Sequence, residues 1–254
     1  TLFVTLEPCC HYGKTPPCTN EIVKRGIKNV VIGCEDPNPI VKSKGIKYLK
    51  DHGVNVTYGI LEDLCKDLHK RLIVYFEKKR PYIILKWAES FDGFIAPKIK
   101  NNKRPYWISN ELSKQIVHKW RSQEHAIMIG HKTKKNDNAF LDVRNWNNIN
   151  NRKFVVGRDL EDLEGFEIIE TNGKILSAND LSKNLFNKKI QSIIIEGGLF
   201  TLNKFIESNI WDEARVFKSN TKIYDGTSSP KLNLNYNEKT QIDKDTLYHF
   251  KNYQ

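Results

Sequence analysis

Four side chains of the kinds that bind metal ions lie close together near the start of the chain. The stretch "TLEPCCHYGKTPPC" at residues 5–18 contains Cys9, Cys10, His11 and Cys18. Thiolates and imidazole nitrogens are the usual protein ligands of zinc. Prolines stand directly before Cys9 and Cys18, and they restrict the backbone ahead of each thiol. The stretch predicts a zinc-binding loop, and a cluster of loop cysteines without metal is the alternative.

Further candidate groups lie at the ends of predicted strands in the second half of the chain. In "ILKWAESFDGFIA" at residues 84–96, Lys86 belongs to an apolar strand that leads into a turn. Glu196 directly follows the apolar run "III" at residues 193–195. It is followed by Gly197 and Gly198, whose backbone amides can approach a phosphate. Each signal is weak alone, because strand-end lysines and tight glycine turns are common.

Two arginines offer planar guanidinium groups that bind phosphate oxygens in pairs. Arg121 lies in a predicted helix and Arg144 in a polar stretch after it. By residue type alone, each is more often a surface partner in a salt bridge.

The elements that must position these groups alternate between strand and helix. In the first third, helices are predicted over 21–26 and 62–80, and strands over 29–34 and 54–61 with another helix between them. Short apolar strands that alternate with helices favour a mostly parallel α/β sheet.

A second α/β region begins near "KKRPY" at residues 78–82, where Pro81 ends the helical periodicity. An Asn-rich stretch at 145–153 predicts a surface loop. Beyond Tyr224 the pattern predicts no element. Strands are predicted over 82–88, 125–130, 153–158 and 192–198, and helices over 109–123 and 199–208.

Composition narrows the class of protein. The 254 residues are 39% hydrophobic and 28% charged, and no apolar run is long enough to span a bilayer, so a membrane protein is not expected. Five cysteines do not form an even disulfide framework, which favours the cytoplasm. The net charge of +11 fits a lysine-rich surface or an anionic small-molecule partner. A nucleic-acid partner is not favoured, because no basic stretch alternates with aromatic residues.

The first motif closely resembles the deaminase domain of the bifunctional riboflavin-biosynthesis deaminase/reductase family. The resemblance implies that Cys9 and Cys18 are two of three zinc ligands and that Cys10 and His11 are only neighbours. In such deaminases an upstream His-x-Glu supplies the third ligand and the general acid/base. That motif has no counterpart here, and the chain starts at Thr1, which we interpret as a truncation. We expect this chain not to deaminate and the full-length protein to do so.

The second half is similar to the reductase domain of the same family. Several motifs occur in the family's order: K-x-A-x-S-x-D-G-x-x-A from Lys86, "YWIS" at 106–109, the stretch 120–144, and "IIIEGG" ending at Gly198. The resemblance implies an α/β protein with a partial cytidine-deaminase-like three-layer domain at 1–79 and a dihydrofolate-reductase-like domain at 80–254.

The resemblance also assigns roles to individual residues. It implies catalytic roles for Lys86 and Asp137, and substrate contacts for Ser109, Arg121, Leu141, Arg144 and Glu196. It implies cofactor contacts for Glu89, Trp107, Thr133, Asp137, Gly198, Leu199, Phe200, Thr201, Leu202, Asn203 and Lys204. We expect Arg158 to meet the 2′-phosphate of the cofactor, which would favour NADPH over NADH.

The function implied by the resemblance has two steps. A zinc-dependent step deaminates a diaminopyrimidinone ribosylamine 5-phosphate, and NADPH then reduces C1 of the ribose to give the ribityl chain. The implied partners are phosphorylated pyrimidines and a second copy of the chain, which forms a homodimer through the reductase domain. Two alternatives are a nucleic-acid-editing zinc deaminase, and a catalytically inactive partner protein stapled by zinc.

Overall fold

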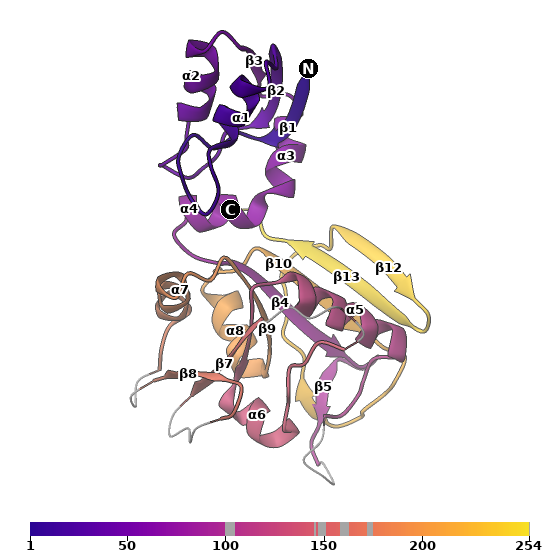
Figure 1. Cartoon of the computed structure of the whole chain (residues 1–254). Coiled ribbons are helices and arrows are strands. Elements are labelled where there is room, and N and C mark those ends of the chain that lie inside the picture. The colour runs from indigo at the N-terminus through magenta and orange to yellow at the C-terminus, as the bar shows by residue number, and fades with distance from the viewer. Residues whose placement is uncertain (100–104, 145, 147–150, 158–162, 172–174, 254) are drawn as a thin grey trace. The chain divides into compact units, whose positions relative to one another are not determined.

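The computed structural model describes residues 1–99, 105–144, 146, 151–157, 163–171 and 175–253. The chain divides into two compact units, Thr1–Arg80 and Pro81–Gln254 (Figure 1). Each unit buries a hydrophobic core of its own, and each is described separately below.

The first unit contains a three-stranded parallel sheet in the order β1-β2-β3. Val30 and Ile32 on β2 face α1 and α2, which contribute Ile22 and Leu49 to the same core. Gly33 faces the opposite side, where a Cβ atom would collide with the Cys65 sulfur of α3. The strands are β1 Leu2–Leu6, β2 Asn29–Cys34 and β3 Asn55–Tyr58, and the helices are α1 Cys18–Lys24, α2 Lys44–Asp51, α3 Glu62–Leu68 and α4 Lys70–Glu77.

Glu7, directly after β1, is a buried carboxylate that fixes the loops of this unit. It accepts hydrogen bonds from the backbone amides of Asp36, Ser43 and Ile46 at 3.2, 3.0 and 3.0 Å. Two of these donors lie at the start of α2, where a negative charge is stabilised.

The second unit is built on an eight-stranded sheet in the order β12-β13-β10-β4-β9-β6-β7-β8. β13 runs antiparallel to both of its neighbours, and the other pairs are parallel. The strands are β4 Tyr82–Glu89, β6 Ala126–Gly130, β7 Arg152–Gly157, β8 Glu167–Glu170, β9 Ser192–Gly197, β10 Glu213–Lys218, β12 Glu238–Ile242 and β13 Asp245–Lys251. β5 Phe94–Pro97 and β11 Gly226–Ser228 form a separate two-stranded sheet.

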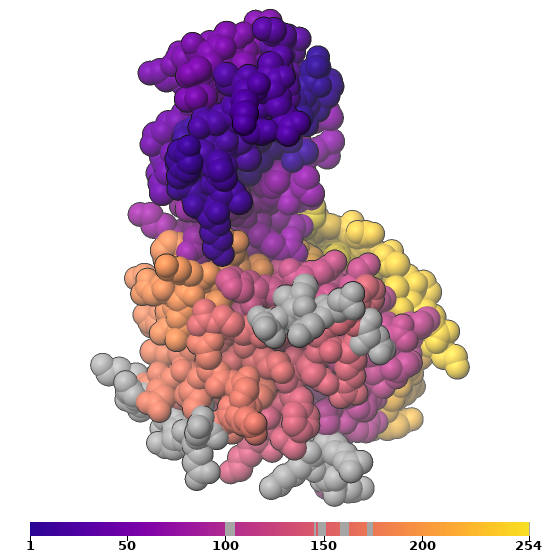
Figure 2. Space-filling model, viewed as in Figure 1, coloured from indigo at the N-terminus to yellow at the C-terminus, as the bar shows by residue number. Residues whose placement is uncertain are grey.

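Helices cover both faces of the large sheet. On one face, Leu181 and Leu185 of α7 and Phe205 of α8 pack into the main core. On the other face, Val117 of α5 packs against Phe217 of β10. Figure 2 shows magenta residues from the early part of this unit beside its yellow C-terminal residues, and Trp120 of α5 contacts His249 of β13 edge to face. The helices are α5 Glu111–Gln123, α6 His131–Asp137, α7 Ala178–Asn187 and α8 Leu199–Glu207.

Several predicted boundaries change in the structure. The first helix begins at Cys18, directly after Pro17, rather than at residue 21. The helix predicted over 62–80 is divided into α3 and α4 at His69, whose ring lies 2.9 Å from the Thr5 hydroxyl. Residues 145 and 147–150 of the predicted loop at 145–153 lie outside the described residues, and the prediction is wrong at its end, because β7 starts at Arg152, which forms an ion pair with Glu167.

Candidate active site

The carboxylate of Glu196 lies at the centre of a cluster of three charged side chains. Arg121 donates two hydrogen bonds to it, from Nε to Oε1 and from Nη2 to Oε2, both at 2.7 Å. The Lys86 ammonium lies 3.9 Å from the same Oε2. Because the guanidinium is planar, the two parallel hydrogen bonds fix its orientation. The cluster therefore holds one carboxylate between two cations at defined positions.

Strand register brings this cluster together. Leu85 of β4 pairs with Ile195 of β9, so the following residues, Lys86 and Glu196, lie beside each other on one face of the sheet. α5 covers that face and carries Arg121 in its last turn. The charged groups are therefore held at the edge of an apolar layer, where water is scarce.

Burial and mutual attraction set the protonation states of the cluster. Burial would raise the pKa of Glu196, but Arg121 and Lys86 outweigh it and lower the pKa to about 2. Burial lowers the pKa of Lys86 against the attraction of Glu196, and the charge of Arg121 lowers it further. Glu196 is therefore ionised at neutral pH, and Lys86 gives up its proton more readily than an exposed lysine.

The loop between α6 and β7 carries two predicted substrate residues. Leu141 is buried with a φ of 50°, and it packs against Ile127 and Ile129 of β6. Arg144 is exposed, and its Nε donates to the Asp142 carboxylate at 2.7 Å. Arg121 also donates from Nη1 to the Asp142 carbonyl at 3.0 Å, so the loop is tied to the charged cluster.

Glycines at the carboxyl ends of β6 and β9 form a narrow cradle. A Cβ atom on Gly130 would lie 2.8 Å from the Thr201 hydroxyl, and one on Gly198 would lie 2.8 Å from the Thr133 hydroxyl. Gly198 also has a φ of 62°, a conformation that favours glycine. α8 starts directly after Gly198, so its free amides and positive dipole end face the same space.

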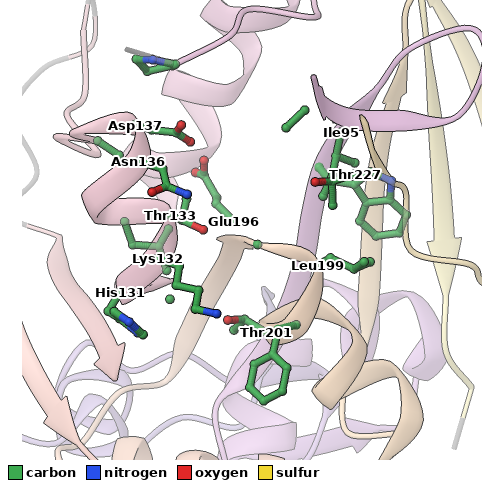
Figure 3. Close-up of a pocket in the computed structure, with 18 of the residues that line it drawn as sticks. Ile95, His131, Lys132, Thr133, Asn136, Asp137, Glu196, Leu199, Thr201 and Thr227 are labelled. Carbon is green, nitrogen blue, oxygen red and sulfur yellow. The ribbon is translucent and has the colours of Figure 1, made fainter. Parts of the chain in front are cut away.

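A cavity of about 1570 Å³ connects the charged cluster with the cradle. Figure 3 shows Thr133, Asp137 and Glu196 pointing into it from one side and Ile95 and Thr227 from the other. The predicted site residues that line it are Lys86, Trp107, Ser109, Arg121, Thr133, Asp137, Leu141, Glu196, Gly198, Leu199, Phe200, Thr201 and Lys204. This volume is large enough for a dinucleotide together with a second small molecule.

Other predicted site residues lie elsewhere. Leu202 is buried in the main core, and Glu89 accepts a hydrogen bond from Trp87 Nε1 at 3.1 Å beside a second, smaller cavity. Asn203 and Arg144 are not among the described residues that line the large cavity. Arg158 lies outside the described residues.

Sequence reasoning missed parts of the cavity wall. The β5–β11 sheet contributes Ile95, an unassigned position of the motif that starts at Lys86, and Thr227, which lies beyond the last predicted element. His131 and Lys132 at the start of α6 also line the cavity. Their position directly after a buried strand was the available signal, because ligands bind at the carboxyl ends of parallel strands.

The two predicted zinc ligands lie in the first unit and are close together. The Cys18 amide donates to the Cys9 sulfur at 3.3 Å. A hydrogen bond with Cys9, followed by burial, raises the pKa of the Cys18 thiol. Within the described residues no group of three or more His, Cys, Asp or Glu side chains is arranged to hold a metal ion. A catalytic zinc requires three protein ligands, so these two thiols do not complete such a site by themselves.

No helix in the described parts of the chain is both long enough and apolar enough to cross a membrane.

Comparison with known families and proteins gives a consistent result. The family model described as the RibD C-terminal domain matches residues 81–223. The riboflavin biosynthesis protein RibD of Aquifex aeolicus is 29% identical over 100% of this chain and 81% of its own length. RibD of Actinobacillus pleuropneumoniae is 33% identical over 85% of this chain and 66% of its own length.

Solved structures agree with these sequence matches. A diaminohydroxyphosphoribosylaminopyrimidine deaminase/5-amino-6-(5-phosphoribosylamino)uracil reductase from Thermotoga maritima has a TM-score of 0.84 at 28% identity, over 98% of this chain and 79% of its own. Acinetobacter baumannii RibD has a TM-score of 0.83 at 26% identity, over 98% of this chain and 80% of its own. The mixed α/β fold with its large central sheet is therefore similar to that of known RibD structures.

Proposed function

The chain belongs to the RibD C-terminal domain family, and on that premise we propose that it acts in riboflavin biosynthesis as the NADPH-dependent reductase of 5-amino-6-(5-phosphoribosylamino)uracil. The observation that carries the proposal is the cluster of Lys86, Arg121 and Glu196 at one end of a cavity whose other end is a glycine cradle. The cluster suits a polar, phosphorylated substrate, and the cradle suits a dinucleotide phosphate.

The residues of the cradle fit the phosphates of NADPH. Side chains at positions 130 and 198 would fill the space between the α6 and α8 turns, so glycine keeps the backbone amides open there. Thr133 and Thr201 add hydroxyl groups at the same place, and Lys204 adds a cation. When bound, NADPH supplies the hydride for the reduction.

The charged cluster performs the protein's part of the reaction. Hydride addition at C1′ of the ribose breaks the C1′–O4′ bond, and the electron pair of that bond stays on the ring oxygen, which takes up a proton. We assign Lys86 as the donor of this proton, because burial lowers its pKa and it faces the cavity. Arg121 holds the Glu196 carboxylate, and that carboxylate in turn positions the Lys86 ammonium, which would face the reacting carbon of the bound substrate.

Substrate recognition involves the opposite wall and the loop after α6. Arg144 would bind the 5-phosphate by turning from Asp142 into the cavity, since the side chain is exposed and attached only through its Nε in the described contacts. Ser109 and Asp137 supply polar contacts for the sugar or the pyrimidine.

We also infer finer features of the two units. The first unit would be the zinc-deaminase domain predicted at 1–79, with a partial cytidine-deaminase-like arrangement, and the second the dihydrofolate-reductase-like domain predicted at 80–254. Their parallel sheets support this assignment. We also infer a homodimer through the second unit, which sedimentation of the purified chain would test.

We do not expect this chain to deaminate, because the described residues add no third metal ligand to the Cys9 and Cys18 thiols. Zinc titration should show weak or substoichiometric binding. Tight stoichiometric zinc would instead assign Cys10 or His11 as a ligand.

NADPH oxidation with the deaminated substrate tests the reductase. We expect turnover by the wild-type chain and its loss, by about a hundredfold or more, in Lys86→Ala, Asp137→Asn and Arg144→Ala. Lys183→Ala, on the exposed side of α7, is the matched control and should retain full activity. No turnover by correctly folded wild type would overturn the proposal.

A further inference from the structure

His118 of α5 is a buried histidine that makes contact with the substrate loop. Its Nδ1 lies 2.9 Å from the Asp142 carbonyl oxygen and 3.2 Å from the Arg144 backbone nitrogen. The Arg144 amide hydrogen points toward Nδ1. A single ring nitrogen thus faces one acceptor and one donor of the same loop, two residues apart.

The loop depends on side chains for its shape. Between Ala139 and Arg144, no backbone-to-backbone hydrogen bond is formed with the rest of the described chain. Instead, Lys134 Nζ donates to the Ala139 carbonyl at 2.8 Å and Lys153 Nζ to the Phe140 carbonyl at 2.9 Å. Each carbonyl in this stretch that accepts a hydrogen bond therefore accepts it from a cationic or titratable side chain.

The hydrogen on Nδ1 decides which of these groups are paired, because one ring nitrogen cannot donate to the Asp142 carbonyl and accept the Arg144 amide at once. A bare Nδ1 accepts the Arg144 amide hydrogen and meets the Asp142 carbonyl as a second acceptor, but that carbonyl keeps its hydrogen bond from Arg121 Nη1 at 3.0 Å. A proton on Nδ1 would turn the nitrogen into a donor toward Asp142 and leave the Arg144 amide facing a second donor. The Arg144 backbone would then lose its only hydrogen bond in the described structure.

We propose that His118 is a positioning residue for the reductase: its unprotonated Nδ1 holds the Arg144 backbone in place so that the Arg144 side chain can bind the substrate phosphate. A proton on Nδ1 releases that backbone and weakens phosphate binding. This inference rests on the proposed function only for the identity of the phosphate, because the hydrogen-bond exchange itself needs no substrate.

Burial and the neighbouring charges together favour the neutral ring of His118, the form that can present a bare Nδ1 to the loop. The ring faces Arg121 on its own helix, Glu196 on β9, and Asp142 and Arg144 on the loop. Burial, followed by the charge of Arg121, lowers the pKa of His118 against the opposing effects of a hydrogen bond to the Asp142 carbonyl and of the Asp142 carboxylate. We therefore expect the loop to be held at neutral pH and to be released only as the pH falls below the ordinary histidine range.

The kinetic test compares two amide substitutions by their KM for the phosphorylated substrate between about pH 5.5 and pH 8.5. His118→Asn places an amide oxygen near the position of Nδ1, so it keeps an acceptor that does not titrate. His118→Gln places its amide near the position of Nε2 and leaves the Arg144 amide without a partner. The substrate phosphate also titrates, near pH 6, but equally for every variant.

We expect His118→Gln to raise KM about threefold to tenfold at every pH, with kcat unchanged within about twofold, which is the loss of one hydrogen bond. His118→Asn should keep the wild-type KM at high pH. At low pH its KM should rise only as far as the titration of the substrate phosphate requires, and therefore less than the KM of the wild type. His125→Asn is the matched control, because His125 Nδ1 also accepts a backbone amide, that of Gln191, away from the cavity. Equal pH profiles for the wild type and His118→Asn would overturn the proposal.

A second readout does not depend on catalysis. In the ligand-free protein, the backbone amide NMR signal of Arg144 should shift with pH as His118 titrates, and it should be pH-independent in His118→Asn. If the Arg144 amide signal does not shift as His118 titrates, the inference is wrong even if the enzyme is a reductase. A coupled signal in a chain that does not turn over the substrate supports the hydrogen-bond exchange and overturns only the proposed function.

Discussion

At the scale of single residues, Glu196 connects the stability of the second unit with its chemistry. The carboxylate is buried but remains charged because Arg121 and Lys86 face it. Removing one member of such a cluster leaves the others buried without compensation, which costs more than the net value of the interaction. Substitutions here therefore report on folding as well as on catalysis, and the two effects must be measured separately.

Glu196→Gln keeps the shape of the side chain and removes its charge. We expect the free energy of unfolding to fall by about 3 kcal/mol near neutral pH, measured by urea denaturation. Because folding lowers the pKa of Glu196 from 4.5 to about 2, its charge stabilises the folded state above about pH 4.5. That contribution disappears as the pH falls toward 2, so the difference between wild type and variant should shrink there. Glu207→Gln, at an exposed position, should change nothing, and a pH-independent difference would contradict the assignment.

Lys86→Met removes the assigned proton donor while keeping an unbranched side chain. We expect kcat to fall about a hundredfold to a thousandfold, with little change in NADPH affinity. In the wild type, an acid that must be protonated gives a rate that falls as the pH rises through its pKa, which burial places below 10.5. The variant should lack this alkaline decline. A decline that persists in Lys86→Met would assign the proton to another group.

At the scale of elements, the cradle depends on how closely the turns before α6 and α8 approach each other. Gly198→Ala would place a methyl group 2.8 Å from the Thr133 hydroxyl, in a backbone conformation with φ of 62°. We expect NADPH affinity, measured by fluorescence titration, to fall about tenfold or more. Gly165→Ala is the matched control, because it has a φ of 77° but no atom within 4 Å of the new methyl group. Equal loss in both variants would mean that backbone strain, and not the cradle, is responsible.

The central parallel strands of both units were predictable from the sequence because they are short, apolar and buried on both faces. β2, β4, β6 and β9 occur close to the predicted positions. The β12–β13 hairpin was missed, because β12 is almost entirely exposed and carries no apolar periodicity. The hairpin joins the large sheet through the pairing of β13 with β10, which no local sequence pattern reveals.

The candidate site was predictable only in part, because contacts between residues that are distant in sequence leave no local pattern. Motifs identified Lys86, Arg121 and Glu196 as separate signals, whereas their contact depends on strand register and on the face that α5 covers. His118 carried no signal of its own, because a histidine in an amphipathic helix is indistinguishable from a core residue until the loop that it contacts is known.

At the scale of the whole molecule, the charged cluster, the cradle and the cavity all lie within residues 81–254. This unit has its own core and its own helices on both faces of the sheet. The assigned reductase chemistry uses no group of the first unit. The boundary falls between Arg80 and Pro81, where a proline follows the helix α4 and its exposed basic end.

A fragment of residues 81–254 should therefore fold and reduce the substrate without the first unit. We expect kcat and the KM for NADPH to lie within about threefold of the values for the entire chain, because a domain with its own core folds independently. The matched comparison is the entire chain with Cys9→Ser and Cys18→Ser, which alters the first unit but leaves it attached. A fragment that is folded by circular dichroism but inactive, beside an active double variant, would show that residues 1–80 contribute to the reductase site.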